Sequence, residues 1–283
     1  MQLNKPLNLP KVTASSTVGG DGVHIEKSER TPLLIFGATA VGFGALLLFL
    51  PGSLANKLML LSTGTCAQRP AHSYFMGDMQ LPMEGRMVGI FAGFALTLFF
   101  LWFIGHGRAL HLPRRPLMLL LVAMVASMAL DGLNATAFDA GLPTLYQPQN
   151  WLRLTTGVLS GIGLAGLLQP FFNTVIWRRG FNRRSFQSGG ELGAMLVLGA
   201  ILWLATFSGW GWLYWPVALL TIAGLIAALV MMNMLTFALI LRLERRVESP
   251  LNLLTPLSLV FIFSIGELIL FAAVRVVLLG SPV

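Results

Sequence analysis

Residues 214–241 read YWPVALLTIAGLIAALVMMNMLTFALIL, a continuous apolar run. An α-helix rises about 1.5 Å per residue, so this run is long enough to cross a hydrocarbon core about 30 Å thick. The run at 116–131 is the shortest in the chain, and we expect its helix to continue through the DGLNATAF segment. The sequence therefore predicts an all-α protein, a polytopic bundle of about seven transmembrane helices. The other apolar runs lie at residues 33–50, 86–105, 116–131, 152–177, 191–207 and 254–279.

The composition agrees with a chain that is solvated mainly by lipid. Apolar residues make up 55% and charged residues 11% of the 283 residues, and the mean hydropathy is +0.76. A soluble domain carries about 25% charged residues. Residues 1–31 are polar and lack the apolar core and cleavage site of a signal peptide. We predict that they form a cytoplasmic tail and that residues 32–283 form the helical bundle.

The positions of the basic residues predict the orientation of the bundle. Of the 19 Lys and Arg residues, 14 lie in the tail 1–31 and in the loops 106–115, 178–190 and 242–253. The positive-inside rule places these segments in the cytoplasm, the C-terminus outside, and the chain in the cytoplasmic (inner) membrane. Because topology explains the net charge of +8, we expect membrane lipids and no nucleic acid as partners. Anionic-lipid contact is an alternative role for the basic loops.

Polar chemistry is concentrated in the longest loop on the predicted outer side, TCAQRPAHSYFMGDMQLPMEGRMVGIFAG, residues 65–93. Cys66 and His72 could act as a nucleophile and its base, or could bind a metal together with Asp78 and Glu84. The sequence spacing does not decide between these readings, and we assign no metal and no cofactor. All four histidines lie outside the apolar runs, so none is placed to ligate a membrane-buried haem.

The loop is preceded by SLANKLMLLSTG, residues 53–64, which is amphipathic and is expected to lie along the membrane interface. Cys66 is the single cysteine of the chain, so an intrachain disulfide is excluded.

Several polar residues lie near the outer ends of different predicted helices. We expect Asp131 to pair with Arg153 or Arg86, because ionisable groups within a membrane usually face an opposite charge. Glu267, two turns deeper than Arg275, is expected to pair with an arginine on a neighbouring helix. In the alternative interpretation the arginines snorkel at helix ends, or one ion pair only fixes the helix register. The candidate ligand-binding residues are Arg86, Asp131, Asn150, Arg153 and Glu267.

Glycines recur every four residues in two of the predicted helices. Gly85, Gly89 and Gly93 lie at the start of the run 86–105, and Gly157 and Gly161 lie in the run 152–177. Small residues at this spacing let helix backbones approach closely in lipid. We therefore predict that these two helices are close neighbours and that their arginines reach one outer patch.

Three segments of the chain resemble the domain-of-unknown-function 2085 family of prokaryotic membrane proteins. Family members carry Cys-His-Gln-x-Pro-x-Arg-Ser, followed by Pro-x-Cys-x-Arg-Cys-x-Gly-Ile at the start of a helix. The resemblance covers about residues 60–170. The matching residues are Cys66, Gln68, Pro70 and Ser73, then Pro82, Arg86, Gly89, Ile90 and Gly93, then Asp131–Gly132, Asn150, Arg153, Thr156 and Gly157.

The sequence departs from the family pattern at its histidine and at the cysteines of its second segment. Ala67 replaces the family histidine, and Glu84 and Met87 stand where the second segment has cysteines. A metal or redox role that needs three cysteines is therefore not carried over to this chain. The resemblance implies a membrane protein with a polar site on its outer side, and it implies no known activity.

Two functional hypotheses follow from these observations. In the first, the outer site binds a small anion or an anionic lipid headgroup through Arg86 and Arg153, oriented by Asp131 and Asn150. In the second, the chain is a non-catalytic accessory subunit of a larger membrane complex. An enzyme that uses Cys66 or His72 ranks below both, so the sequence favours a protein that is not an enzyme.

Overall fold

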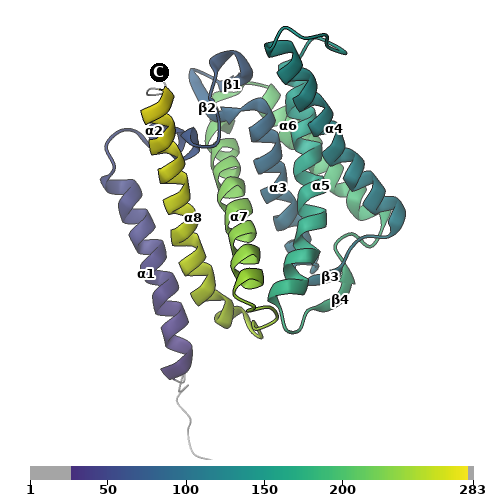
Figure 1. The fold of residues 1–283 in the computed structure, drawn as a ribbon. Coiled ribbons are helices and arrows are strands. Elements are labelled where there is room, and N and C mark those ends of the chain that lie inside the picture. Colours follow the sequence, from purple (N-terminus) through teal and green to yellow (C-terminus); the bar gives the residue numbers. More distant parts are fainter. Residues whose placement is uncertain (1–26, 280–283) are drawn as a thin grey trace, which may run out of the picture.

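The computed structural model describes residues 27–279, and seven of its helices are long and apolar enough to cross a membrane (Figure 1). This confirms the predicted all-α transmembrane class. The predicted polar tail lies mostly outside the described residues. The long helices are α1 (Lys27–Phe49), α3 (Gly85–Phe103), α4 (Arg115–Asp139), α5 (Asn150–Ile176), α6 (Gly189–Phe207), α7 (Tyr214–Ile240) and α8 (Pro250–Leu279).

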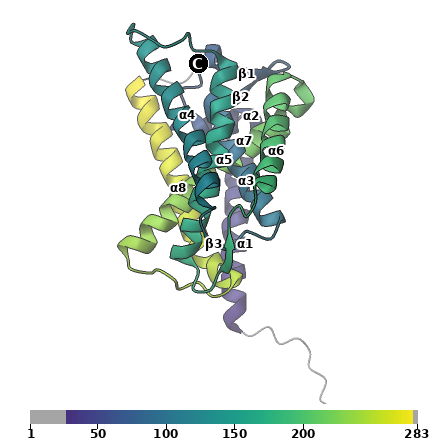
Figure 2. The same cartoon turned by 90° about the vertical axis from the view of Figure 1, so that its right-hand side faces the viewer.

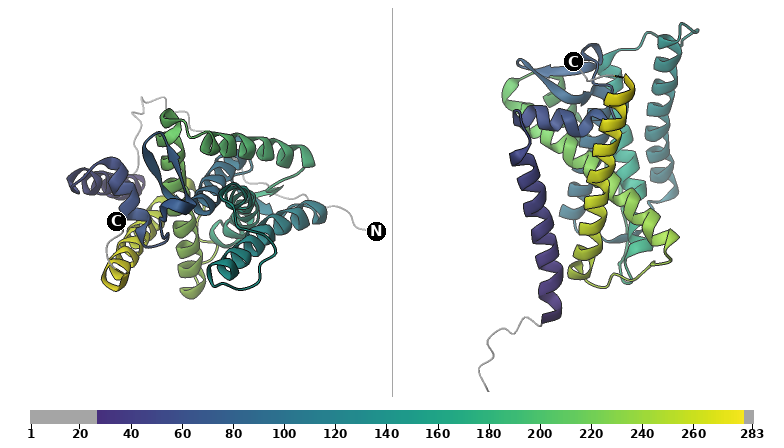
Figure 3. Two further views of the ribbon diagram at one scale, coloured as in Figure 1. Left: turned by 90° about the horizontal axis from the view of Figure 1, so that it is seen from above. Right: turned by 60° about the vertical axis from the view of Figure 1, so that its left-hand side comes forward.

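The long helices are not equally buried. In the most apolar 18-residue stretch of α5, 61% of the residues are buried by the rest of the protein. In the corresponding stretch of α1 none is buried. α5 packs closely on α3 and α4, and α1 packs at the periphery against α8 (Figures 1 and 3). α4 runs without a break to Asp139, which confirms the expected extension through the DGLNATAF segment.

Short elements cover one end of the bundle, which we call the hairpin end. α2 (Leu54–Thr63) lies across the bundle rather than along it (Figure 3), and it buries Leu58 and Leu61, which confirms the predicted amphipathic helix. It leads into the 3-10 turn Pro70–His72 and the antiparallel hairpin of β1 (Ser73–Met76) and β2 (Met79–Glu84). The hairpin was not predicted. It extends from the membrane-spanning helices and carries polar residues above α3.

A second pair of strands lies at the opposite end of the bundle (Figure 2). β3 (Ala109–His111) pairs in parallel with β4 (Phe181–Arg184), so two of the basic loops are joined through their backbones. Every residue of β4 is exposed, in agreement with a solvated basic face. The polar side chains beneath are used structurally, since Asn173 donates to the carbonyl oxygens of Gly107 and Ala109.

The predicted glycine contact between α3 and α5 is confirmed. A Cβ atom added at Gly89 would lie 2.6 Å from the backbone nitrogen of Val158, and one added at Gly161 would lie 2.4 Å from the carbonyl oxygen of Ile90. These distances are too short for any side chain, so the two backbones touch. α7 makes an equally close contact that was not predicted, where Gly224 faces the carbonyl oxygen of Phe91.

Candidate functional site

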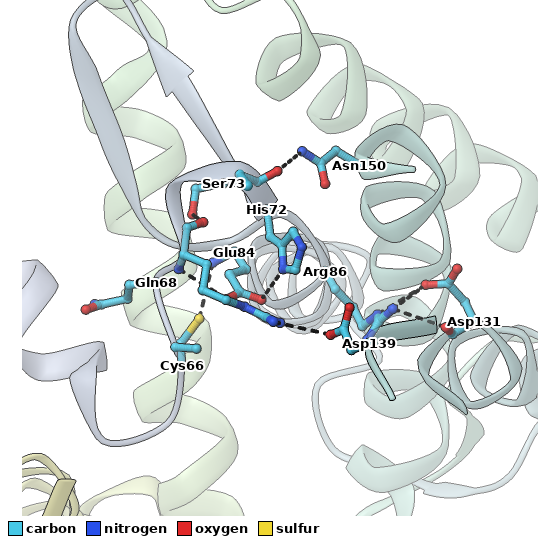
Figure 4. A network of polar contacts seen from close by, with 12 residues as sticks. Cys66, Gln68, His72, Ser73, Glu84, Arg86, Asp131, Asp139 and Asn150 are labelled. Carbon is cyan, nitrogen blue, oxygen red and sulfur yellow. Dashed lines mark hydrogen bonds and ion pairs between the residues drawn. The ribbon is translucent and has the colours of Figure 1, made fainter. Parts of the chain in front are cut away.

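A group of ionisable side chains gathers between the hairpin and the ends of α3, α4 and α5 (Figure 4). We call it the polar cluster. The hairpin segment, α3, α4 and α5 each contribute to it, so residues far apart in the sequence meet at one end of the bundle. Its members are Arg69, His72, Glu84, Arg86, Asp131, Asp139 and Arg153.

Arg86 and Asp131 form the most buried ion pair of the cluster. Nη2 and Nε of Arg86 donate to Oδ2 of Asp131 at 2.6 and 3.2 Å. The Asp131 side chain is 1% exposed and that of Arg86 is 22% exposed. Of the two partners proposed for Asp131 from the sequence, the structure therefore selects Arg86, and Arg153 is not its partner.

Asp131 also holds the loop between α4 and α5. The Tyr146 hydroxyl donates to Oδ1 of Asp131 at 2.9 Å. The pKa of Tyr146 is raised, first by burial and then by this hydrogen bond. Asn134, one turn further along α4, bonds to backbone groups of Leu145 and Tyr146. The sequence analysis missed Tyr146 because it lies in a loop without a recognisable motif.

Arg69 bridges two carboxylates. Its Nε lies 3.1 Å from Oε1 of Glu84, and its Nη1 lies 3.3 Å from Oδ2 of Asp139. The sequence analysis did not place Arg69 or Asp139 in the site. Asp139 follows Asp131 by about two helical turns, so an extended α4 brings both carboxylates to the same end of the bundle.

Arg153 differs from the other arginines of the cluster. The residue is 6% exposed, its Nε is buried without a hydrogen-bond partner, and it forms no ion pair within 4.0 Å with any residue between 27 and 279. It lines a small cleft of about 60 Å³ together with Arg69, Arg86, Glu84 and Asp139. A buried guanidinium normally finds acceptors for its donors, so the buried Nε of Arg153 is an unexplained polar atom of this site.

His72 lies beside the same cleft. Its Nδ1 is 3.8 Å from Oε2 of Glu84 and has no hydrogen-bond partner among the described residues. The pKa of His72 is lowered, first by burial and then by the positive charges of Arg153 and Arg69. The imidazole is therefore neutral near pH 7.

Cys66 has a structural environment rather than a reactive one. The residue is buried, and its Sγ accepts the backbone N–H of Glu84 at 3.2 Å. Burial raises the pKa of the thiol, so the nucleophilic thiolate is disfavoured. His72 is not hydrogen-bonded to it, and residues 27–279 contain no group of three His, Cys, Asp or Glu side chains placed to bind a metal. The nucleophile and metal interpretations therefore find no support.

Three further residues singled out in the sequence lie outside the cleft. Asn150 donates to the carbonyl oxygen of Ala71 at 2.8 Å and so holds the hairpin segment over α5. The prediction that Glu267 pairs with an arginine is wrong, because Oε2 of Glu267 accepts instead from Asn233 of α7. Arg275 donates to backbone carbonyl groups, among them those of Thr63 and Ala67 at 2.6 and 2.9 Å.

These helices and this cluster define the class: a multi-pass membrane protein with a polar cluster at one end of its bundle. Residues 66–167 match the family model described as "Predicted membrane protein (DUF2085)", which confirms the resemblance seen in the sequence. The match covers the hairpin, α3, α4 and most of α5, which together build the polar cluster. No match was found among curated proteins or among solved structures.

Proposed function

We propose that the cleft of the polar cluster binds a small oxyanion and that Arg153 is its main ligand. A buried charge without a partner costs several kcal/mol, on the order of 3–5 kcal/mol when a partner has been removed. An anion that accepts hydrogen bonds from Arg153 would offset this cost. The observation that carries the proposal is the buried Nε of Arg153, which has no hydrogen-bond partner among the described residues in a residue that is 6% exposed.

The size and the hydrogen-bond donors of the cleft support a phosphate, sulfate or carboxylate group. About 60 Å³ corresponds to roughly four to six water positions at about 10–15 Å³ each. Three arginines and two carboxylates line it, and Asp131, which pairs with Arg86 beside the lining, brings the cluster to three arginines and three carboxylates. The Nε of Arg153, which lacks a partner in the part of the chain that the structure describes, and not a net positive charge, therefore supports an oxyanion. The oxyanion could be free in solution or could belong to the headgroup of an anionic lipid, since both present the same acceptors.

The roles of the other candidate residues change accordingly. Arg86 is held by Asp131, so it contributes positive potential more than free donors. Asn150 fixes the segment that covers the cleft. We propose that both act by positioning. The sequence-based hypothesis gave this role to Asn150 and placed Arg86 in direct contact with the ligand.

The test compares Arg153→Gln with Arg179→Gln, which removes the same charge from an exposed site at the other end of the bundle. The full chain is purified in detergent, and thermal unfolding is followed with added phosphate or with chloride at equal ionic strength. Phosphate at about 100 times its Kd should stabilise the wild type and Arg179→Gln by about 2.7 kcal/mol. Arg153→Gln should fold stably and show no shift. Equal phosphate shifts in all three proteins would overturn the proposal.

Nanodiscs separate the two sources of the oxyanion. If the ligand is free, phosphate should stabilise the wild type in discs of phosphatidylcholine alone. If the ligand is a headgroup, adding phosphatidylglycerol should stabilise the wild type and remove the effect of phosphate. Arg153→Gln should lose whichever of these responses the wild type shows.

The accessory-subunit hypothesis has support from the exposed position of α1. An apolar groove of about 470 Å³ separates α1 from α8 and is lined by Ile35, Phe43 and Phe261 among others. A membrane partner would bury such a surface, and lipid would also cover it. Purification from native membranes distinguishes them, because a partner at constant stoichiometry supports the subunit and a chain that elutes alone contradicts it.

A further inference from the structure

A second apolar groove is lined by residues of α1, α2 and α8. These three helices lie on the opposite side of the bundle from α4 (Figure 3). Its volume is about 560 Å³, which is within the usual range of ligand pockets, about 300–1,000 Å³. One basic side chain interrupts its apolar walls. The groove is lined by Leu47 of α1, Leu50 just after it, Lys57 and Leu61 of α2, and Leu268 and Ala273 of α8.

The shape of this groove is fixed in part by contacts within the protein. The backbone at Gly64, after the end of α2, lies so close to α8 that an added Cβ would be 2.5 Å from Cβ of Phe271. Arg275 of α8 donates to the carbonyl oxygens of Thr63 and Ala67 on the same segment. These contacts hold α2 across the bundle against α8, so two of the three walls of the groove are fixed by contacts within the protein.

Lys57 is the basic residue of the groove. It makes no ion pair within 4.0 Å among the described residues, and it is half-buried among apolar side chains. α2 carries no other charged side chain. An ammonium group on a helix that lies along the membrane interface is placed at the level of the phospholipid phosphates.

We propose that this groove is a binding site for one anionic phospholipid. The acyl chain lies against α8 and the end of α1, and the headgroup phosphate pairs with Lys57. A zwitterionic phospholipid fills the groove equally well, but the positive charge of its own headgroup offsets the attraction. One Lys near an anionic surface corresponds to about a fivefold preference, so we expect phosphatidylglycerol to bind about fivefold more tightly than phosphatidylcholine with the same chains.

Native mass spectrometry of the full chain in detergent tests the site, with titration of each lipid in turn. Arg153→Gln serves as the background, so that a headgroup in the cleft of the polar cluster does not contribute. Lys57→Gln should keep the lipid adduct and reduce the preference for phosphatidylglycerol to about one, since both lipids then meet a neutral residue. Ala273→Trp should fill the groove from an exposed position and lose the adduct with both lipids.

A matched control is available in a groove of about 520 Å³ between α5 and α6, which Ala200 lines. Ala200→Trp should leave the adduct and its preference unchanged. The proposal is overturned if Ala273→Trp retains the adduct, if Lys57→Gln retains the fivefold preference, or if the Arg153→Gln background shows no lipid adduct. None of these outcomes bears on phosphate binding at Arg153, so the two sites are tested independently.

Discussion

The ion pair between Arg86 and Asp131 predicts an unequal response to the removal of either partner. Arg86→Gln leaves the Asp131 carboxylate in a site that is 1% exposed, with only hydroxyl groups of Tyr146 and Thr156 as donors. Asp131→Asn leaves a guanidinium that is 22% exposed and can reach water. The two substitutions remove the same pair, and they differ in which charge remains buried.

The expected magnitudes follow from that difference. An uncompensated buried charge costs about 3–5 kcal/mol, so Arg86→Gln should lower the free energy of unfolding by an amount in this range. A partly solvated donor that loses its acceptor costs about 1–3 kcal/mol, which is the expectation for Asp131→Asn. The double variant should lose less than the sum, by a coupling energy of about 0.5–3 kcal/mol, because no buried charge remains.

The free energies are measured by unfolding in mixed micelles, with tryptophan fluorescence and labelling of the buried Cys66 as two independent probes. Coincident transitions support two-state analysis. Arg178→Gln is the control, because it breaks an exposed pair with Glu248 and should cost no more than about 1 kcal/mol. A larger loss for Asp131→Asn than for Arg86→Gln, or strictly additive effects, would refute this account of the pair.

Three further predictions concern packing, the thiol and topology. Gly89→Ala should destabilise the bundle, because the added Cβ would lie 2.6 Å from a backbone nitrogen. Gly193→Ala places its Cβ in open space and should be neutral or stabilise the bundle by up to about 1 kcal/mol. Thermal unfolding in detergent measures both effects. Arg275→Gln should speed maleimide labelling of Cys66 at pH 7, because it frees the backbone segment that covers the thiol; unchanged labelling would contradict this role. A reporter that is active only outside the cytoplasm should work at the C-terminus and fail within the loop 241–249, and the reverse would invert the topology.

The helices could be predicted from the sequence because their signals are local. An apolar run of sufficient length has few alternatives to a helix in lipid, since every backbone polar group must be satisfied within the segment. The glycine spacing predicted the contact of α3 with α5 for the same reason, because one repeat on each helix marks the touching face. Gly224 gave no such signal, since a single glycine in α7 has no repeat, and its contact with Phe91 depends on the tertiary fold.

The hairpin and the pairing of charges could not be predicted in this way. β1 and β2 are short, and Pro82 interrupts the second strand, so neither shows the alternation of a typical strand. Arg86 and Arg153 both lie near the ends of their helices. Which of them pairs with Asp131 depends on the packing of α4 against α3 and α5, and the sequence does not give that packing. The predicted partner of Glu267 was wrong because a polar residue within the apolar helix α7, Asn233, donates the hydrogen bond in place of an arginine.

The residues that carry the family resemblance meet where α3 crosses α5. The geometry of this crossing explains why Arg153 lies beside another arginine and has no partner of its own between residues 27 and 279. An added Cβ at Gly157 would lie 2.4 Å from the carbonyl oxygen of Arg86, so the close crossing of α3 and α5 begins at the residue that bears the first guanidinium. Arg153 lies one turn before Gly157, and the crossing therefore brings two like charges to the same end of the bundle. Asp131 neutralises Arg86 alone. If these residues served only to fix the register of α3 against α5, the close contacts at Gly89 and Gly157 would be sufficient. The second arginine adds a buried Nε that has no partner among the described residues, and the proposed oxyanion would supply its acceptor.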